Sequence, residues 1–83
     1  MEKRSGKVLE LVYRWYSESG PAFIASKRAV EEECGMSRAE VENSLNWLIG
    51  KGFIELWQMG DCVRITEKGI TYSEKKKRID KIS

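Results

Sequence analysis

The feature that most constrains the fold is a pair of short helical segments separated by Gly35-Met36. The first spans residues 27–34 and follows Ser26, whose hydroxyl can cap the opening turn. Gly35 suits the left-handed conformation that ends many helices. The second spans residues 38–49 and opens on a capping box, in which Ser37 is followed three residues later by Glu40. The sequence therefore predicts two helices that meet at a tight turn.

The second of these helices has two distinct sides. Val41, Leu45 and Leu48 form one apolar stripe, and we expect Leu48 to lie at the centre of the core. The opposite side carries Ala39, Asn43, Asn46 and Trp47. This pattern predicts an exposed Trp47, and an exposed indole indicates a contact, either with the wing near Trp57 or with a protein partner.

A longer helix is expected over residues 3–18, before Ser19-Gly20-Pro21 breaks the pattern. Its apolar arc is broad and consists of Val8, Leu9, Leu11, Val12, Trp15 and Tyr16. Two interpretations are open. The arc belongs to a central core helix, which is the usual meaning of an amphipathic stripe, or part of it meets a second subunit.

Over residues 53–59 and 62–66, successive side chains alternate between two faces, as they do in β-strands. Met59-Gly60-Asp61 forms the turn between them. They predict a β-hairpin, preceded by a brief extended segment at residues 22–25. Thr66 can cap a last helix that starts at Glu67, and residues 75–83 form its end or a frayed basic tail. We expect one domain over residues 1–83, of the α+β class and mostly helical.

Two helices joined by a glycine-containing turn are typical of a helix-turn-helix. The stretch from Ser37 to Ile54, with Leu48-Ile49-Gly50-Lys51-Gly52-Phe53-Ile54, resembles the recognition helix and first wing strand of small bacterial and archaeal winged-helix transcriptional regulators. Ile65-Thr66-Glu67-Lys68-Gly69 resembles the segment that closes their wing. The resemblance implies a winged helix-turn-helix with a three-helix core, a short strand, a two-stranded wing and a C-terminal helix.

The same resemblance implies sequence-specific binding of double-stranded DNA, with helix 38–49 in the major groove. The side chains that it places on base edges are Ser37, Arg38, Ala39, Glu42, Asn43 and Asn46. Asn suits adenine, Arg suits guanine and Glu suits the cytosine amine. Lys27, Arg28, Lys51 and Arg64 are the candidate phosphate contacts.

Charge bears on this hypothesis. The formal net charge is +2, but residues 69–83 alone carry +3, which leaves the first 68 residues at −1. Glu31, Glu32 and Glu33 form an acidic run that either flanks the DNA side, where it repels phosphates, or points away from it. The main alternative is a protein-interaction module that uses Trp47 and its neighbours, and the acidic run also favours it. RNA binding is a weaker one, because the aromatic residues fall mainly on core-facing stripes.

The composition excludes several other functions. The chain has no His, so a Ser-His or Cys-His catalytic pair is impossible, and Cys34 and Cys62 supply too few ligands for a structural zinc site. We expect no enzyme activity, catalytic residue, metal or cofactor. No secretory or membrane-spanning segment is visible, so we expect a cytoplasmic protein with free thiols rather than a Cys34–Cys62 disulfide. We also expect a homodimer that forms through the first and last helices.

Overall fold

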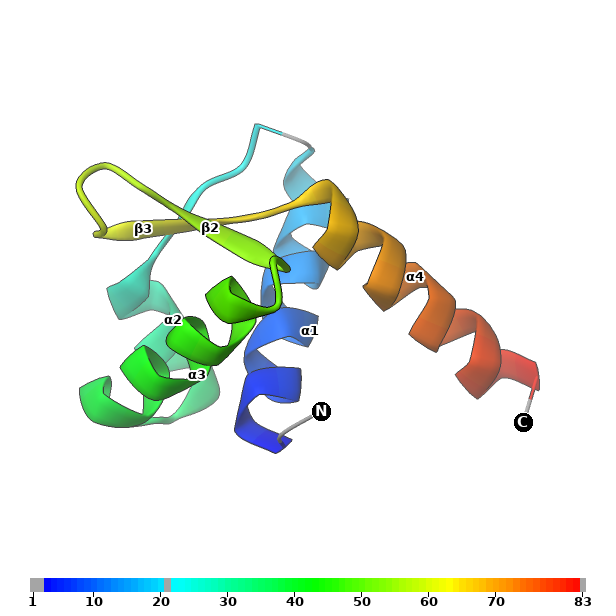
Figure 1. Ribbon diagram of the computed structural model, residues 1–83, viewed down its shortest axis with the longest axis horizontal. Helices are drawn as coiled ribbons and strands as arrows, with labels where there is room; N and C mark the ends of the chain where they lie inside the picture. The colour runs from blue at the N-terminus through cyan, green and yellow to red at the C-terminus, as the bar shows by residue number, and fades with distance from the viewer. Residues whose placement is uncertain (1–2, 21, 83) are drawn as a thin grey trace.

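A computed structural model describes residues 3–20 and 22–82, with side chains placed as far as Lys77 (Figure 1). Its elements are α1 (Lys3–Ser19), β1 (Ala25–Ser26), α2 (Lys27–Cys34), α3 (Arg38–Gly50), β2 (Ile54–Trp57), β3 (Cys62–Ile65) and α4 (Glu67–Ile82). Every predicted helix and strand is present, and their order is the predicted one. No helix in the described part is long and apolar enough to cross a membrane.

Helices α1, α2 and α3 pack together beneath a small sheet, and α4 leaves the far end of that sheet (Figure 1). Leu48 has 0% of its surface exposed and lies in the core, as predicted. Helix α1 supplies Val8, Leu9, Leu11 and Val12 to the same cluster, so its apolar arc is mainly a core face. The rest of the arc is half-buried, and Trp15 packs on Phe23 with ring centroids 5.9 Å apart.

The sheet is antiparallel in the order β1-β3-β2. Ala25 pairs with Val63, and Ile54 pairs with Ile65. All four of these side chains are buried, which fixes the register of the hairpin because a slip of one residue would expose them. The connection after β2 is sharply turned, with left-handed conformations at Gln58 (φ 50°), Met59 (φ 59°) and Gly60 (φ 91°).

Helix α4 begins where predicted, because the Thr66 hydroxyl accepts a hydrogen bond from the Gly69 N–H at 3.1 Å. Of the two alternatives for residues 75–83, the helix end is the one observed, because the backbone stays helical to Ile82. Glu and Lys are good helix formers, and neither Gly nor Pro follows Gly69. Lys75, Lys76 and Lys77 are exposed, and the side chains from residue 78 onward lie outside the described part.

Both thiols are free, as predicted. Cys34 is buried at the end of α2, and burial raises the pKa of its thiol. Lys7 of α1 donates a hydrogen bond from Nζ to the Cys34 carbonyl oxygen at 3.0 Å. This contact closes the carboxyl end of α2 and attaches it to α1, because a terminal helix carbonyl has no partner in its own helix.

Candidate nucleic-acid interface

Local hydrogen bonds define the α2–turn–α3 unit. Ser26 caps α2, its Oγ accepting from the Ala29 N–H at 3.1 Å. Gly35 ends α2 with φ 63°, a left-handed conformation that glycine adopts without strain. Ser37 then begins α3 with a complete capping box: its Oγ accepts from the Glu40 N–H at 3.2 Å, and its own N–H donates to Glu40 Oε1 at 3.0 Å. Short-range hydrogen bonds therefore define where α2 begins and where α3 begins.

The outer face of α3 presents polar side chains that the rest of the molecule leaves unused. Arg38, Asn43 and Asn46 are exposed, and none of them makes a hydrogen bond or ion pair with another described residue. Ser37 and Ala39 are exposed beside them. Val41, Ser44, Leu45 and Leu48 are buried on the opposite side, so the helix phase is the predicted one. The face is held rigidly while its polar groups remain available to a ligand.

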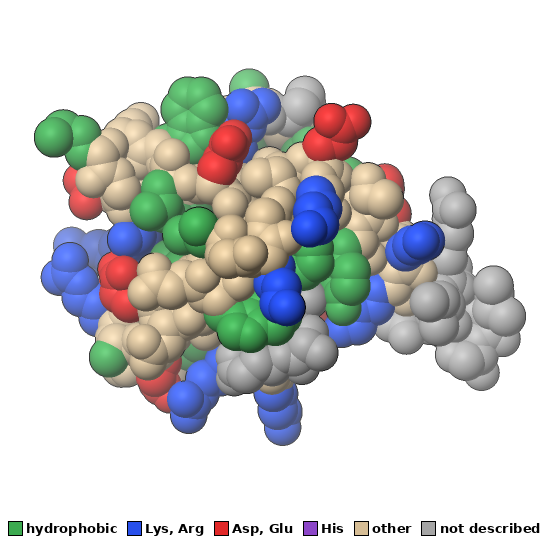
Figure 2. Space-filling model, viewed as in Figure 1, with side chains coloured by type: hydrophobic (Ala, Val, Ile, Leu, Met, Phe, Trp, Pro, Cys, Tyr) green, Lys and Arg blue, Asp and Glu red, His purple; other side chains and the backbone are tan. Residues whose placement is uncertain are grey.

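A shallow groove of about 430 Å³ brings three predicted residues together, namely Lys27, Arg28 and Arg38. Ser26, Glu31 and Asp61 complete its lining. The hairpin loop is joined to α2 here, because the Lys27 N–H donates to the Asp61 carbonyl oxygen at 3.0 Å. In Figure 1 the hairpin loop and the starts of α2 and α3 all lie along the left edge, and Figure 2 shows Lys and Arg side chains gathered there.

Two of the three cationic residues in the groove, Lys27 and Arg28, already form ion pairs within the protein. Lys27 Nζ lies 3.0 Å from Glu42 Oε1, which links the start of α2 to α3, and only 22% of the Lys27 side chain is exposed. Arg28 Nε lies 3.6 Å from Glu32 Oε1, and both of these side chains are well exposed. The Lys27–Glu42 pair therefore competes with any ligand for both partners, whereas the exposed Arg28–Glu32 pair is weak and easily opened.

The acidic run does not point away from the groove as a unit. Glu31 lines the groove beside Arg28 and Arg38, and Glu32 pairs with Arg28. Glu33 faces the other side of α2, near Lys7 and Arg14 of α1. The 100° step between helical residues separates the three carboxylates, so Glu31 and Glu32 reduce the positive charge of the groove and Glu33 does not.

The expectation of an exposed Trp47 is wrong. Its indole is half-buried against the core, beside the buried Ser44 one turn earlier. Lys51 Nζ lies over the ring, 5.3 Å from its centroid. A large ring at the flank of an apolar stripe can turn back onto the core, which the helical phase alone does not reveal. The protein-interaction alternative thereby loses one of its two motives, while the acidic run remains as the other.

Two predicted phosphate contacts lie outside the groove. Lys51 follows the opposite end of α3 and is occupied with Trp47. Arg64, in the middle of β3, lies 4.0 Å from Glu55 and has its guanidinium 5.5 Å from the centre of the Trp57 ring. The structure thus gathers Lys27, Arg28 and Arg38 but leaves Lys51 and Arg64 in separate surroundings.

Sequence reasoning missed Asp61 in the groove and the exposed apolar side chains of the hairpin, Leu56, Trp57 and Met59. Strand alternation groups Leu56 with the buried Ile54, yet Leu56 is 43% exposed. The hairpin extends past the edge of the core there, and only the three-dimensional arrangement shows where the core ends. The position of Met59 in a turn was the one available signal of exposure.

This architecture is similar to that of a MarR family regulator from Neisseria meningitidis, with a TM-score of 0.68 and 15% sequence identity. The likeness covers 98% of this chain and 56% of that regulator, so this chain spans little more than half its length. The fold is a winged helix. The predicted α+β class and winged helix-turn-helix resemblance are therefore confirmed, and the β2–β3 hairpin is the wing. No family model and no curated protein sequence matches the chain.

Proposed function

We propose that this winged helix is a sequence-specific DNA-binding transcription regulator that inserts α3 into the major groove. The observation that carries the proposal is the face of α3, where Arg38, Asn43 and Asn46 are exposed and unpaired with any described residue. The similar solved structure is that of a regulator, which supports the same class of function. Free thiols suit the reducing cytoplasm, and the proposal involves no catalytic step.

The proposed chemistry divides between bases and backbone. Arg38 can donate two hydrogen bonds to a guanine edge, and the amides of Asn43 and Asn46 can bond an adenine edge. Ser37 and Ala39 lie at the start of the same helix, close enough for contacts with thymine methyl or phosphate groups. Lys27 and Arg28, at the N-terminal end of α2, are placed for the phosphates that flank the groove. Base contacts supply specificity, and the lysine and arginine contacts supply salt-dependent affinity.

The test is fluorescence anisotropy of a labelled duplex, first with mixed sequence and then with a selected site, at several salt concentrations. We expect Arg38→Ala and Asn43→Ala each to lower the affinity for the selected site by about ten- to a hundredfold. Arg14→Ala is the matched charge control, because Arg14 is exposed on α1 and only pairs with Glu18 at 3.9 Å. Absence of binding at low salt, or equal binding by all three variants, would refute the proposal.

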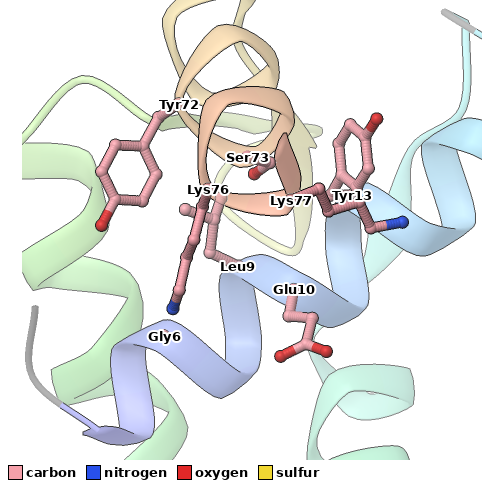
Figure 3. Close-up of a pocket in the computed structure, with 8 residues that line it drawn as sticks. All are labelled: Gly6, Leu9, Glu10, Tyr13, Tyr72, Ser73, Lys76 and Lys77. Atoms are coloured by element: carbon pink, nitrogen blue, oxygen red, sulfur yellow. The ribbon is translucent and has the colours of Figure 1, made fainter. Parts of the chain in front are cut away.

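We further propose that the regulator is a homodimer that pairs through α1 and α4. Helix α4 extends away from the body (Figure 1). A hollow of about 160 Å³ lies between α4 and α1. Figure 3 shows Leu9 and Tyr13 of α1 facing Ser73, Lys76 and Lys77 of α4 across that hollow. The Tyr13 ring is half-buried, with Lys77 Nζ 5.1 Å from its centroid. A second subunit would cover this surface and set two α3 helices about 34 Å apart.

The oligomeric state is measured by sedimentation velocity, with circular dichroism as the check on folding. We expect a dimer for the wild type and a folded monomer for Tyr13→Lys, because the new ammonium would be buried in the interface beside that of Lys77. Glu18→Gln, a change at an exposed residue of α1 that does not line the hollow, should leave the dimer intact. A monomeric wild type would overturn the dimer proposal and leave the DNA proposal standing.

A further inference from the structure

The wing carries the largest exposed apolar side chains in the part of the chain that the structure describes. Leu56 is 43% exposed, Trp57 41%, and Met59, in the loop at the tip, is fully exposed. Figure 2 shows a hydrophobic side chain protruding beyond the hairpin loop at the upper left of the molecule. Apolar side chains gathered on one protruding element mark a surface that contacts another molecule.

Charge limits what this surface can bind. Residues 52–63 include no Lys or Arg, and Glu55 and Asp61 are their only charged residues. Both carboxylates have cationic neighbours: Glu55 is near Arg64, and Asp61 lines the groove with Lys27, Arg28 and Arg38. The tip itself, Gln58-Met59-Gly60, is uncharged. It therefore cannot bind phosphates by charge, yet it lies beside cations that can.

Main-chain hydrogen bonds hold the tip to the helix-turn-helix. The Lys27 N–H donates to the Asp61 carbonyl oxygen at 3.0 Å, and Ser26 pairs with Cys62 in the sheet. Within the loop, the N–H groups of Gly60 and Asp61 donate to the carbonyl oxygens of Trp57 and Gln58, both at 3.2 Å. The Trp57 indole also bonds within the wing, where its Nε1 donates to Glu55 Oε1 at 3.1 Å. A contact made by the tip is thus preorganised relative to α3.

The tip and the start of α3 face the same side. Arg38 of α3 and Asp61 of the hairpin loop line one groove. In Figure 1 the hairpin loop and the start of α3 both lie along the left edge of the molecule. If α3 lies in the major groove as proposed, a tip on the same side of the molecule faces the adjoining phosphate backbone. The next feature of the duplex there is the minor groove, whose width is about 6 Å.

We propose that the wing tip is an apolar wedge for the minor groove, in which Met59 enters a base-pair step and Trp57 packs on the adjoining sugars. This inference rests on the proposed DNA-binding function and deepens it. Met is among the side chains that proteins insert between base pairs, which unstacks the step and bends the duplex. Steps such as TA deform at least cost, so Met59 adds a preference for deformable sequence without a hydrogen bond to any base.

The wedge is tested with Met59→Ala and Met59→Leu on a selected duplex that carries 2-aminopurine beside a TA step. Leu56→Ala is the matched control, because Leu56 is similarly apolar and exposed but lies on the strand rather than at the tip. We expect wild-type binding to increase the 2-aminopurine fluorescence through unstacking. Met59→Ala should abolish that increase and weaken binding about tenfold, with the salt dependence of affinity unchanged because no phosphate contact is lost. Met59→Leu should retain both signals.

The outcomes separate the two proposals. Binding that depends on Arg38 but is unaffected by Met59→Ala would overturn the wedge and keep the function of α3. A weaker salt dependence in Met59→Ala, or loss of self-association, would also overturn it by showing that the tip meets phosphates or a second copy. Absence of any duplex binding by the wild type would overturn both proposals.

Discussion

Gly69, in the first turn of α4, packs directly against the main chain of Phe53, the residue that leads into the wing. A Cβ built on Gly69 would collide with the Phe53 carbonyl oxygen and come within 2.9 Å of the Ile65 side chain. That carbonyl also accepts a hydrogen bond from the Thr66 N–H at 3.0 Å. The Phe53 and Tyr72 rings stack with centroids 4.8 Å apart. The close approach at Gly69 therefore determines how α4 is attached to the wing.

Replacement of Gly69 by Ala should destabilise the protein, although Ala is the better helix former. We expect a loss of about 1–3 kcal/mol in the free energy of unfolding, because α4 has to move away from a main-chain atom. Gly50→Ala is the control, since Gly50 is also helical and a Cβ there meets nothing within 4 Å. The control should be neutral or up to about 1 kcal/mol more stable. Urea denaturation measures both, and equal stabilities would show that α4 shifts without cost.

Leu48 tests the centre of the core. Leu48→Ala should cost about 2–5 kcal/mol, because Leu48 has 0% exposure and the cavity cannot collapse fully. Leu56→Ala removes the same atoms from a side chain that is 43% exposed and should change stability by less than about 1 kcal/mol. The comparison uses urea midpoints at a constant m-value. A small effect at Leu48 would mean that neighbouring side chains refill the space.

The fold was predictable because short-range signals set the ends of its elements. Ser26, Gly35 and Ser37 each act on residues within one helical turn, and all three behave as the sequence predicts. The inward stripe of α3 follows from helical periodicity in the same way, as the burial of Val41 and Leu45 shows. The need for glycine at position 69 could not be predicted from the sequence, because the contact that requires it is with Phe53, sixteen positions earlier in the chain.

The site was predictable only as a set of exposed residues on α3. Which charges meet depends on how α2, α3 and the wing pack, so the Lys27–Glu42 pair and the place of Asp61 in the groove appear only in three dimensions. Trp47 shows the same limit, because a side chain at the flank of a stripe is exposed or covered according to its neighbours. The apolar wing tip depends on where the core ends, which strand alternation does not encode.

The capping box should make the free energy of unfolding depend on pH. The hydrogen bond from the Ser37 main chain holds the pKa of Glu40 below its usual value, helped by the Ser37 hydroxyl and by Arg4, whose Nη2 lies 3.0 Å from Glu40 Oε2. A carboxyl whose pKa is lower when folded stabilises the fold above its unfolded pKa. That stabilisation is lost as the pH falls through the folded pKa.

Glu40→Gln should therefore reduce the loss of stability on acidification from neutral pH to below pH 4, as followed by thermal unfolding at each pH. Glu18→Gln, on an exposed carboxylate at the other end of α1, is the control and should follow the wild type. Ser37→Ala should remove the cap and cost about 1 kcal/mol at neutral pH. Parallel pH curves for wild type and Glu40→Gln would refute the role of this carboxylate.

We expect Glu42 to lower the affinity for DNA. Its Oε1 lies 3.0 Å from Lys27 Nζ, so the ammonium is neutralised within the protein before any phosphate arrives. Glu42→Gln removes the carboxylate and frees Lys27, and we expect tighter binding at low salt. The slope of log affinity against log salt should steepen by about 0.9 for the one added phosphate contact.

Glu32→Gln is the control variant. Arg28 and Glu32 are both well exposed and 3.6 Å apart, so opening that pair already costs little and the slope should change less. An unchanged slope in Glu42→Gln would mean that Lys27 does not contact the backbone. A weaker affinity for the selected site with an unchanged slope would mean that Glu42 itself reads a base, as its place on α3 first suggested.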